Sequence, residues 1–124
     1  VQRVGTSRKK LVFLGDTREM VHELPAPVRH KIGRSLAVLQ LGNRLAGVTL
    51  LKGFTLAVNE IRVSYDREAY RAVYTVQLGD RVYLLHVFHK KSKSGIGIPQ
   101  RDLELIQRRL ANAIQMEEER DDDR

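Results

Sequence analysis

Apolar and polar residues alternate along three consecutive stretches in the middle of the chain, at residues 58–65, 70–77 and 81–89. A two-residue period puts neighbouring side chains on opposite faces of an extended chain, so each stretch predicts a β-strand. The linkers between them are short, and the second, LGD, contains a glycine suited to a turn. Consecutive strands with such short links must run antiparallel, so the three stretches predict a β-meander.

The third stretch is apolar on both of its faces, which is typical of a central, well-covered strand. In strict alternation one face carries Val82, Leu84, His86 and Phe88, and the other carries Tyr83, Leu85, Val87 and His89. The strand then runs without a turn residue into the segment HKKSK, residues 89–93. A covered strand that ends in imidazole and ammonium groups indicates a functional site at its end.

Helical periodicity precedes these strands. From Thr17, apolar residues recur at Met20, Val21 and Leu24, and Asp16 or Thr17 is available to cap the first turn. Pro25 and Pro27 separate this helix from a second one, whose apolar stripe consists of Val28, Ile32, Leu36 and Leu39. Gly42 is placed to end the second helix in the left-handed conformation. The two helices predict a hairpin with one apolar face, which needs a sheet to cover.

Two further elements complete the predicted fold. Residues 10–15 form an apolar run that predicts a first strand, and Pro99 precedes an amphipathic helix whose stripe is Leu103, Ile106, Leu110 and Ala113 or Ile114. The resulting order predicts an α+β fold, with a small antiparallel sheet, an N-terminal helical hairpin packed on one face and a C-terminal helix. We expect residues 1–116 to form this single domain and leave the other sheet face partly open. The like-charge block at 117–124 predicts an acidic, flexible tail.

The charge of the chain indicates a polyanionic partner. Its 124 residues carry a formal net charge of +7, with a sequence pI of about 10.1. Because the tail carries six acids and two bases, the remaining residues are more basic still. A surface this positive attracts nucleic acid, and the alternative reading is solubility alone.

Several classes of protein are not expected. The chain has no cysteine, which excludes disulfides, thiolate zinc sites and thiol nucleophiles. No segment approaches the ~18 apolar residues of a membrane span, and no apolar stretch of signal-peptide length follows the charged start, so a cytoplasmic location is expected. Carboxylates are dense only in the tail, so neither a two-metal site nor another metal or cofactor is expected.

A cluster of basic and aromatic side chains is predicted where the three strands meet. Meander order brings Arg62 and Arg71 toward the segment 86–93, on the sheet face that is expected to be open. Guanidinium groups clamp phosphates, lysines supply compact charge, and aromatic rings such as that of Tyr74 or Tyr83 stack on unpaired bases. This combination predicts an RNA-binding site.

Such a site is able to cleave RNA without a metal ion. The 2′-hydroxyl of the ribose is the nucleophile, so the protein only has to move protons and stabilise the charge on the phosphate. A histidine among lysines is pushed toward its neutral form and suits proton transfer, which makes His89 and His86 candidates. Alternatively, His86 is a satisfied core residue, Arg62 and Arg71 pair with Glu60 and Asp66 across the strands, and the lysines form only a solvated loop.

Four segments follow one another in a specific order and spacing: NEIRV at 59–63, YRAVYTV at 70–76, GDRVYLLHVFHKKSKSG at 79–95 and IPQRDLELIQRRL at 98–110. In these segments, and in LPAPVRHKIGRSLAVLQLG and LKGF upstream, the chain resembles the phage-derived, HigB-like branch of the RelE/ParE toxin superfamily, over roughly residues 9–114. The resemblance implies a microbial-RNase-like fold and the toxin of a type II toxin–antitoxin system. Relatives of this kind cleave messenger RNA on the ribosome without metal, and a separately encoded antitoxin, typically a helix-turn-helix protein in this branch, neutralises them.

The resemblance also implies roles for individual residues. Arg62 and Arg71 match arginines of the family's strand motifs and are expected to stabilise the phosphate. His89 is expected to transfer protons, with Lys91 in the catalytic set. RNA and ribosome binding is expected from Lys90, Lys91 and Lys93, with Lys52 as a weaker candidate. Independently of the resemblance, the predicted cluster described above adds Tyr74 and His86 as RNA-binding residues. Two alternatives are a ParE-like DNA gyrase inhibitor, for which the basic pocket has no use, and a non-catalytic relic that binds RNA or antitoxin.

Overall fold

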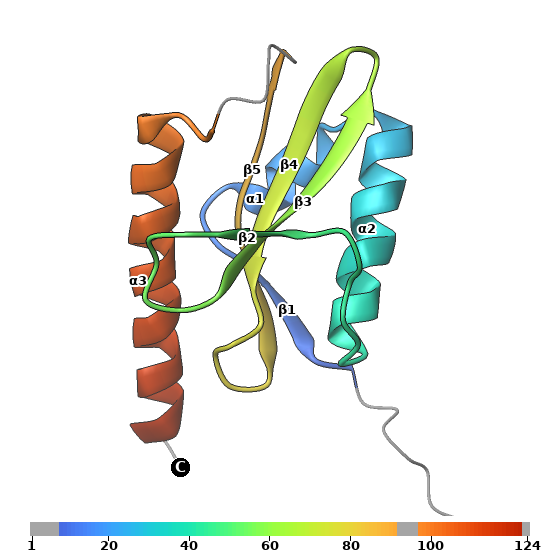
Figure 1. Cartoon of the computed structure of the whole chain (residues 1–124). Helices are drawn as coiled ribbons and strands as arrows, with labels where there is room; N and C mark the ends of the chain where they lie inside the picture. The colour runs from blue at the N-terminus through green and yellow to red at the C-terminus, as the bar shows by residue number, and fades with distance from the viewer. Residues whose placement is uncertain (1–7, 92–96, 123–124) are drawn as a thin grey trace, which may run out of the picture.

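The computed structural model describes residues 8–91 and 97–122 (Figure 1). Its elements, in chain order, are β1 (Lys10–Phe13), α1 (Thr17–His22), α2 (Ala26–Gln40), β2 (Thr49–Leu51), β3 (Val58–Tyr65), β4 (Glu68–Thr75), β5 (Arg81–Lys91) and α3 (Gln100–Asp122). The strands form one five-stranded sheet in the order β1-β5-β4-β3-β2. The predicted α+β class and the order of its elements are confirmed, and β2 is an additional short strand.

The meander β3–β4–β5 pairs antiparallel throughout, as predicted. Asp66 and Arg67 join β3 to β4, with φ angles of 51° and 66°. Two consecutive positive φ angles are those of the tight two-residue turns that match the twist of a β-hairpin. At the edges, β1 pairs in parallel with β5 and β2 pairs antiparallel with β3, so the sheet is mixed.

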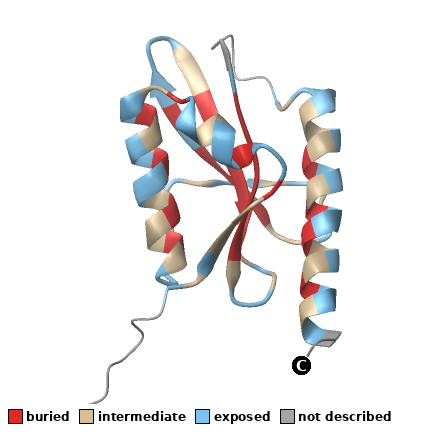
Figure 2. Cartoon of the chain, turned by 180° about the vertical axis from the view of Figure 1, so that it is seen from behind, coloured by how far each residue is buried: buried red, intermediate tan, exposed pale blue. Residues whose placement is uncertain are grey.

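Helices cover both faces of the sheet, which differs from the expectation that they share one face. Figure 1 shows the sheet between α2 and α3, and Figure 2 shows the buried residues concentrated in the strands and on the inward stripes of both helices. The predicted stripe of α2 is buried against one face, which we call the α2 face. On the other, the α3 face, Ile106, Leu110 and Ala113 pack on Val58 and Val73. The face that was expected to be open is therefore partly covered by α3, and only the remainder of it is accessible.

A β-bulge in β5 changes which side chains share a face. Val73 of β4 pairs with His86, whereas the next residue, Tyr74, pairs with Leu84, so Leu85 is an extra residue in β5. An extra residue shifts the alternation by one position. Val82 and Leu84 consequently pack on the α2 side, while His86 and Phe88 belong to the α3 face; the expectation that these four residues share one face is wrong.

The ends of the first two helices are only partly as predicted. Gly42 follows α2 with a φ of +87°, which confirms its predicted left-handed conformation. Asp16 precedes α1, but its carboxylate makes no capping hydrogen bond to the helix. Instead it accepts a hydrogen bond from Nη2 of Arg109 in α3, at 3.0 Å. Asp16 therefore links the start of α1 to α3.

The acidic segment continues α3 instead of forming a flexible tail from Glu117 onwards. The helix extends to Asp122, and Glu117 is buried. Its carboxylate accepts hydrogen bonds from the Tyr83 hydroxyl and from Nη1 of Arg120, and Arg120 also lies 3.5 Å from the Asp80 carboxylate. Burial and the hydrogen bond to Glu117 raise the pKa of Tyr83 to about 12. These contacts fix the last turns of α3 on the sheet.

Across residues 8–91 and 97–122, no helix is long and apolar enough to cross a membrane.

Candidate active site

Two arginines lie side by side on the α3 face, in the half of the meander near the β3–β4 turn. Arg62 of β3 pairs directly with Arg71 of β4, and Arg71 pairs with Phe88 of β5. Directly opposed like charges destabilise an antiparallel pair unless another group compensates them. The predicted convergence of Arg62 and Arg71 on one face is therefore present and requires a counter-charge.

Glu60 supplies that counter-charge. It lies two residues before Arg62 on the same face and is completely buried. One carboxylate oxygen, Oε1, accepts a hydrogen bond of 2.8 Å from Nε of Arg62, and the other, Oε2, lies 3.5 Å from Nη1 of Arg71. The two arginines and the glutamate together keep one net positive charge. Of the alternative in which Arg62 and Arg71 pair with Glu60 and Asp66, the pairing with Glu60 is therefore observed.

The two arginines differ in exposure. The side chain of Arg62 is 48% exposed, whereas that of Arg71 is only 4% exposed. Arg71 also lies over the ring of Phe88, with 5.8 Å from its guanidinium carbon to the ring centroid, a cation–π distance. Its Nε and Nη1 atoms have no hydrogen-bond partner among the described residues. Both atoms are themselves buried, and Nη1 faces the Glu60 carboxylate, so Arg62 is the guanidinium of the pair that is accessible to an anionic ligand.

His86 and Asp102 form the side of this site next to α3. The imidazole Nε2 of His86 lies 2.7 Å from Oδ1 of Asp102, and its Nδ1 lies 3.3 Å from Nη1 of Arg109. These partners assign the proton to Nε2, because an arginine only donates. His86 also stacks on Phe88, with ring centroids 4.9 Å apart. His86 is buried, which agrees with the core alternative; it supports the aromatic ring beneath Arg71 and ties β5 to the first turn of α3.

Asp102 and Arg109 were not predicted as site residues. They are seven positions apart on α3, on the same side as the buried Ile106 between them. Positions separated by three and four residues share one face of a helix. The predicted stripe of α3 could therefore have indicated that both charged residues face the sheet.

His89 lies on the opposite face from the two arginines. Its ring packs against Tyr70, with centroids 5.0 Å apart, and its Nε2 lies 3.2 Å from Oε1 of Glu68. Burial and the neighbouring Glu68 raise the pKa of the Tyr70 phenol. The structure therefore does not bring His89 together with Arg71, although the side chain of His89 is 52% exposed at the end of β5.

Tyr74 and Lys52 also lie apart from the arginine pair. Tyr74 is only 2% exposed and belongs to the core beneath α2, where burial raises the pKa of its phenol. A ring buried in this way has little surface for stacking on a base, so the structure does not support the expected RNA contact of Tyr74. Lys52 is exposed in the segment between β2 and β3.

The lysines after His89 are described only in part. The backbone of Lys90 pairs with Ala69, and that of Lys91 pairs with Glu68, at the far end of the β4–β5 ladder. Lys93 lies outside the described residues. Within the described ranges, no group of three or more histidine, aspartate or glutamate side chains is arranged to hold a metal ion.

Comparisons with known proteins agree with this fold. Residues 19–111 match the family model described as phage-derived protein Gp49-like. Among solved structures, the chain is similar to the Escherichia coli toxin RelE, determined as an arginine-to-alanine double mutant in the free state. The match has 20% sequence identity and a TM-score of 0.52, and it covers 71% of this chain and 87% of that chain. At this identity the likeness shows a shared fold. No curated protein matches the sequence significantly.

Proposed function

Because the chain belongs to the Gp49-like family of phage-derived proteins, we propose that it is the toxin of a type II toxin–antitoxin system and acts as a metal-independent, ribosome-dependent mRNA endonuclease. The family, the RelE-like fold and the resemblance of the sequence to the HigB-like branch support a toxin. The proposed partners are mRNA on the ribosome and a separately encoded antitoxin, of the helix-turn-helix kind in the HigB-like branch.

The observation that carries the nuclease proposal is the arginine pair. Arg62 and Arg71 lie next to each other on one face, and the buried Glu60 holds both. Two neighbouring guanidinium groups suit the non-bridging oxygens of a phosphodiester, which gain negative charge in the transition state. The half-exposed Arg62 is the guanidinium that a phosphate contacts directly, and the buried Arg71 adds positive charge behind it.

The proposed reaction uses the RNA as its own nucleophile. The 2′-oxygen loses its proton and attacks phosphorus, the bond from phosphorus to the 5′-oxygen breaks, and the leaving oxygen receives a proton. The products are a 2′,3′-cyclic phosphate and a 5′-hydroxyl. Arg62 and Arg71 stabilise the charge on the phosphate, and His89 and Lys91 are the groups proposed for proton transfer. His89 reaches the same phosphate only if the RNA passes across the end of β5, so the arginines carry the proposal.

Primer extension on messages from cells that briefly express the protein tests this function. The expected result is a set of discrete 5′ ends within translated codons. Arg62→Ala is expected to reduce cleavage by about tenfold or more, because one charge-assisted contact is worth roughly 1.4 kcal/mol or more. Since Arg62 is half-exposed, the free energy of unfolding of this variant is expected to lie within about 1 kcal/mol of the wild-type value.

Arg108→Ala, an exposed arginine on α3, is the matched control and is expected to cleave normally. Intact messages together with DNA damage would instead indicate a gyrase inhibitor. Intact messages without DNA damage would indicate a non-catalytic protein. Either result would refute the proposed nuclease.

A further inference from the structure

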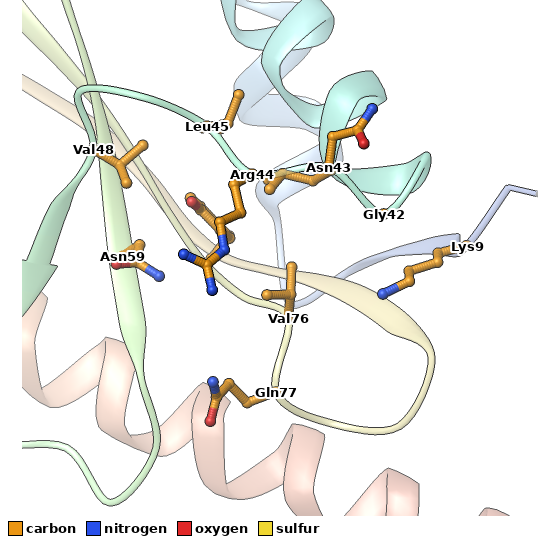
Figure 3. Close-up of a pocket in the computed structure, with 11 residues that line it drawn as sticks. Lys9, Gly42, Asn43, Arg44, Leu45, Val48, Asn59, Val76 and Gln77 are labelled. Carbon is orange, nitrogen blue, oxygen red and sulfur yellow. The ribbon is translucent and has the colours of Figure 1, made fainter.

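A groove of about 500 Å³ lies on the α2 face, between the end of α2, the segment that follows it and the sheet (Figure 3). Its volume is within the range of ordinary ligand sites. The lining combines apolar side chains, including Leu45, Val48 and Val76, with the cations Lys9 and Arg44. No carboxylate is among the lining residues. The arginine pair of the proposed RNA site lies on the other face of the sheet, so this groove is separate from it.

The two cations of the groove are available to a partner. Neither Lys9 nor Arg44 forms an ion pair within the described part of the chain. In Figure 3 the guanidinium of Arg44 lies over the groove, between Asn59 and Val76. Lys9 is held in place by its backbone, which donates to the carbonyl of Gln40 and accepts from the Gln40 side chain. The cationic side of the groove is therefore partly preorganised.

Exposed leucines flank the same groove. The described residues include three large apolar side chains that are exposed, namely Leu41 (48%), Leu50 (58%) and Tyr65 (40%). Leu41 directly precedes Gly42, which lines the groove, and Leu50 pairs across the strands with Asn59, another lining residue. Exposed leucines that border an apolar groove are typical of a surface that a partner covers.

We propose that this groove docks an acidic, amphipathic peptide segment of the antitoxin. Apolar side chains of the segment would fill the groove and cover Leu41 and Leu50, while its carboxylates would meet Lys9 and Arg44. An apolar groove with a cationic border complements such a segment better than it complements a nucleic-acid backbone, which has no apolar side chains to bury. The identity of the partner rests on the proposed function, whereas the chemistry of the surface does not.

The affinity of the purified protein for the product of the neighbouring gene, measured by titration calorimetry, tests this inference. We expect Arg44→Glu to weaken binding about tenfold or more, because a charge that attracted a carboxylate then repels it. Leu50→Ser is expected to weaken binding about fivefold, through the loss of apolar contact. Both positions are exposed, so circular dichroism is expected to show the same thermal unfolding as the wild type.

Matched controls change the same kinds of side chain away from the groove. Arg34→Glu reverses an exposed charge on α2, and Tyr65→Ser removes an exposed apolar group beside the β3–β4 turn. Both variants are expected to bind the product of the neighbouring gene with an affinity within about twofold of the wild-type value.

Three results would overturn the inference. The first is no binding by the neighbouring gene product, and the second is unchanged affinity in both groove variants. The third is an Arg44→Glu variant that keeps its affinity for that protein but loses affinity for a single-stranded RNA 20-mer, which would assign the groove to nucleic acid. Because affinity is measured with purified proteins, it does not depend on RNA cleavage. Weaker binding by the groove variants together with an absence of cleavage would refute the nuclease alone.

Discussion

Removing the charge of Glu60 is expected to destabilise the protein strongly. Glu60→Gln keeps the shape of the side chain but leaves two adjacent guanidinium groups without their counter-charge. At 3.5 Å the attraction between Glu60 and Arg71 is about 5 kcal/mol at an effective dielectric constant of ~20. Desolvation offsets part of this, and breaking a buried pair typically costs roughly 3–5 kcal/mol. Arg62 adds about 1 kcal/mol or less, because it is half-exposed.

For a domain of this size, Tm changes by roughly 4 °C per kcal/mol, so Glu60→Gln is expected to lower Tm by about 12–20 °C. Thermal unfolding followed by circular dichroism at pH 7 measures this shift. The double variant Glu60→Gln/Arg71→Met removes both buried charges, and apolar replacement of a buried ion pair is often neutral or stabilising. Its Tm is therefore expected to recover at least half of the loss.

Glu118→Gln, which removes an exposed carboxylate from α3, is the control and is expected to shift Tm by less than about 2 °C. A Glu60→Gln shift no larger than that of the control would refute the reasoning. A double variant as unstable as the single one would also refute it, because the cost would then not arise from an uncompensated charge.

Two further predictions concern the contacts that hold the last turns of α3. Gly79→Ala is expected to lower the free energy of unfolding, measured in urea, by at least about 1 kcal/mol more than Gly53→Ala does. Both glycines have a positive φ, but of the two only Gly79 would place an added Cβ against a side chain, the carboxylate of Glu117. Equal costs would contradict this. Because the pKa of Tyr83 is raised to about 12 in the folded protein, the unfolded chain loses this proton first. The free energy of unfolding is therefore expected to fall by about 2 kcal/mol as the pH rises from 10 to 12. Urea unfolding at several pH values should show a smaller fall for Tyr83→Phe, and an identical fall would contradict the assignment.

The parts of the fold that were predicted correctly are those specified by local periodicity. The buried stripe of α2 and the antiparallel meander both repeat over many residues, and the left-handed Gly42 follows from its position at a helix end. The short strand β2 has only three residues, too few to show a period. The parallel pairing of β1 with β5 joins segments about 70 residues apart and depends on packing that no local pattern records.

The apolar stripe of α3 continues into the charged segment after Met116, although the composition of that segment does not indicate it. Glu117 follows Ala113 by four residues and Leu110 by seven, so it occupies the buried face of α3. The composition of this segment predicted a solvated tail, but the position of Glu117 on the helix places its side chain against the sheet.

The candidate site was predicted in part. The pairing of Arg62 with Arg71 follows from the short hairpin between their strands. The burial of Arg71 depends on its contacts with Glu60 and Phe88. From the sequence alone, these two residues are only two of several possible neighbours of Arg71. The placement of His86 and His89 on opposite faces follows from their spacing of three residues in a strand, so both could not join one cluster.

The extra residue in β5 separates the strand into two parts with independent alternation. The half before Leu85 is fixed by the core on both faces, and the half after it carries His86, Phe88 and His89. A relative without the extra residue would pair the counterparts of Leu84 and His86 with the same residues of β4, and would present the same set of side chains to the arginines. An ungapped alignment to such a relative would equate residues that lie on opposite faces, so family alignments should place a gap at Leu85. Deletion of Leu85 is expected to leave His86 and His89 on their present faces.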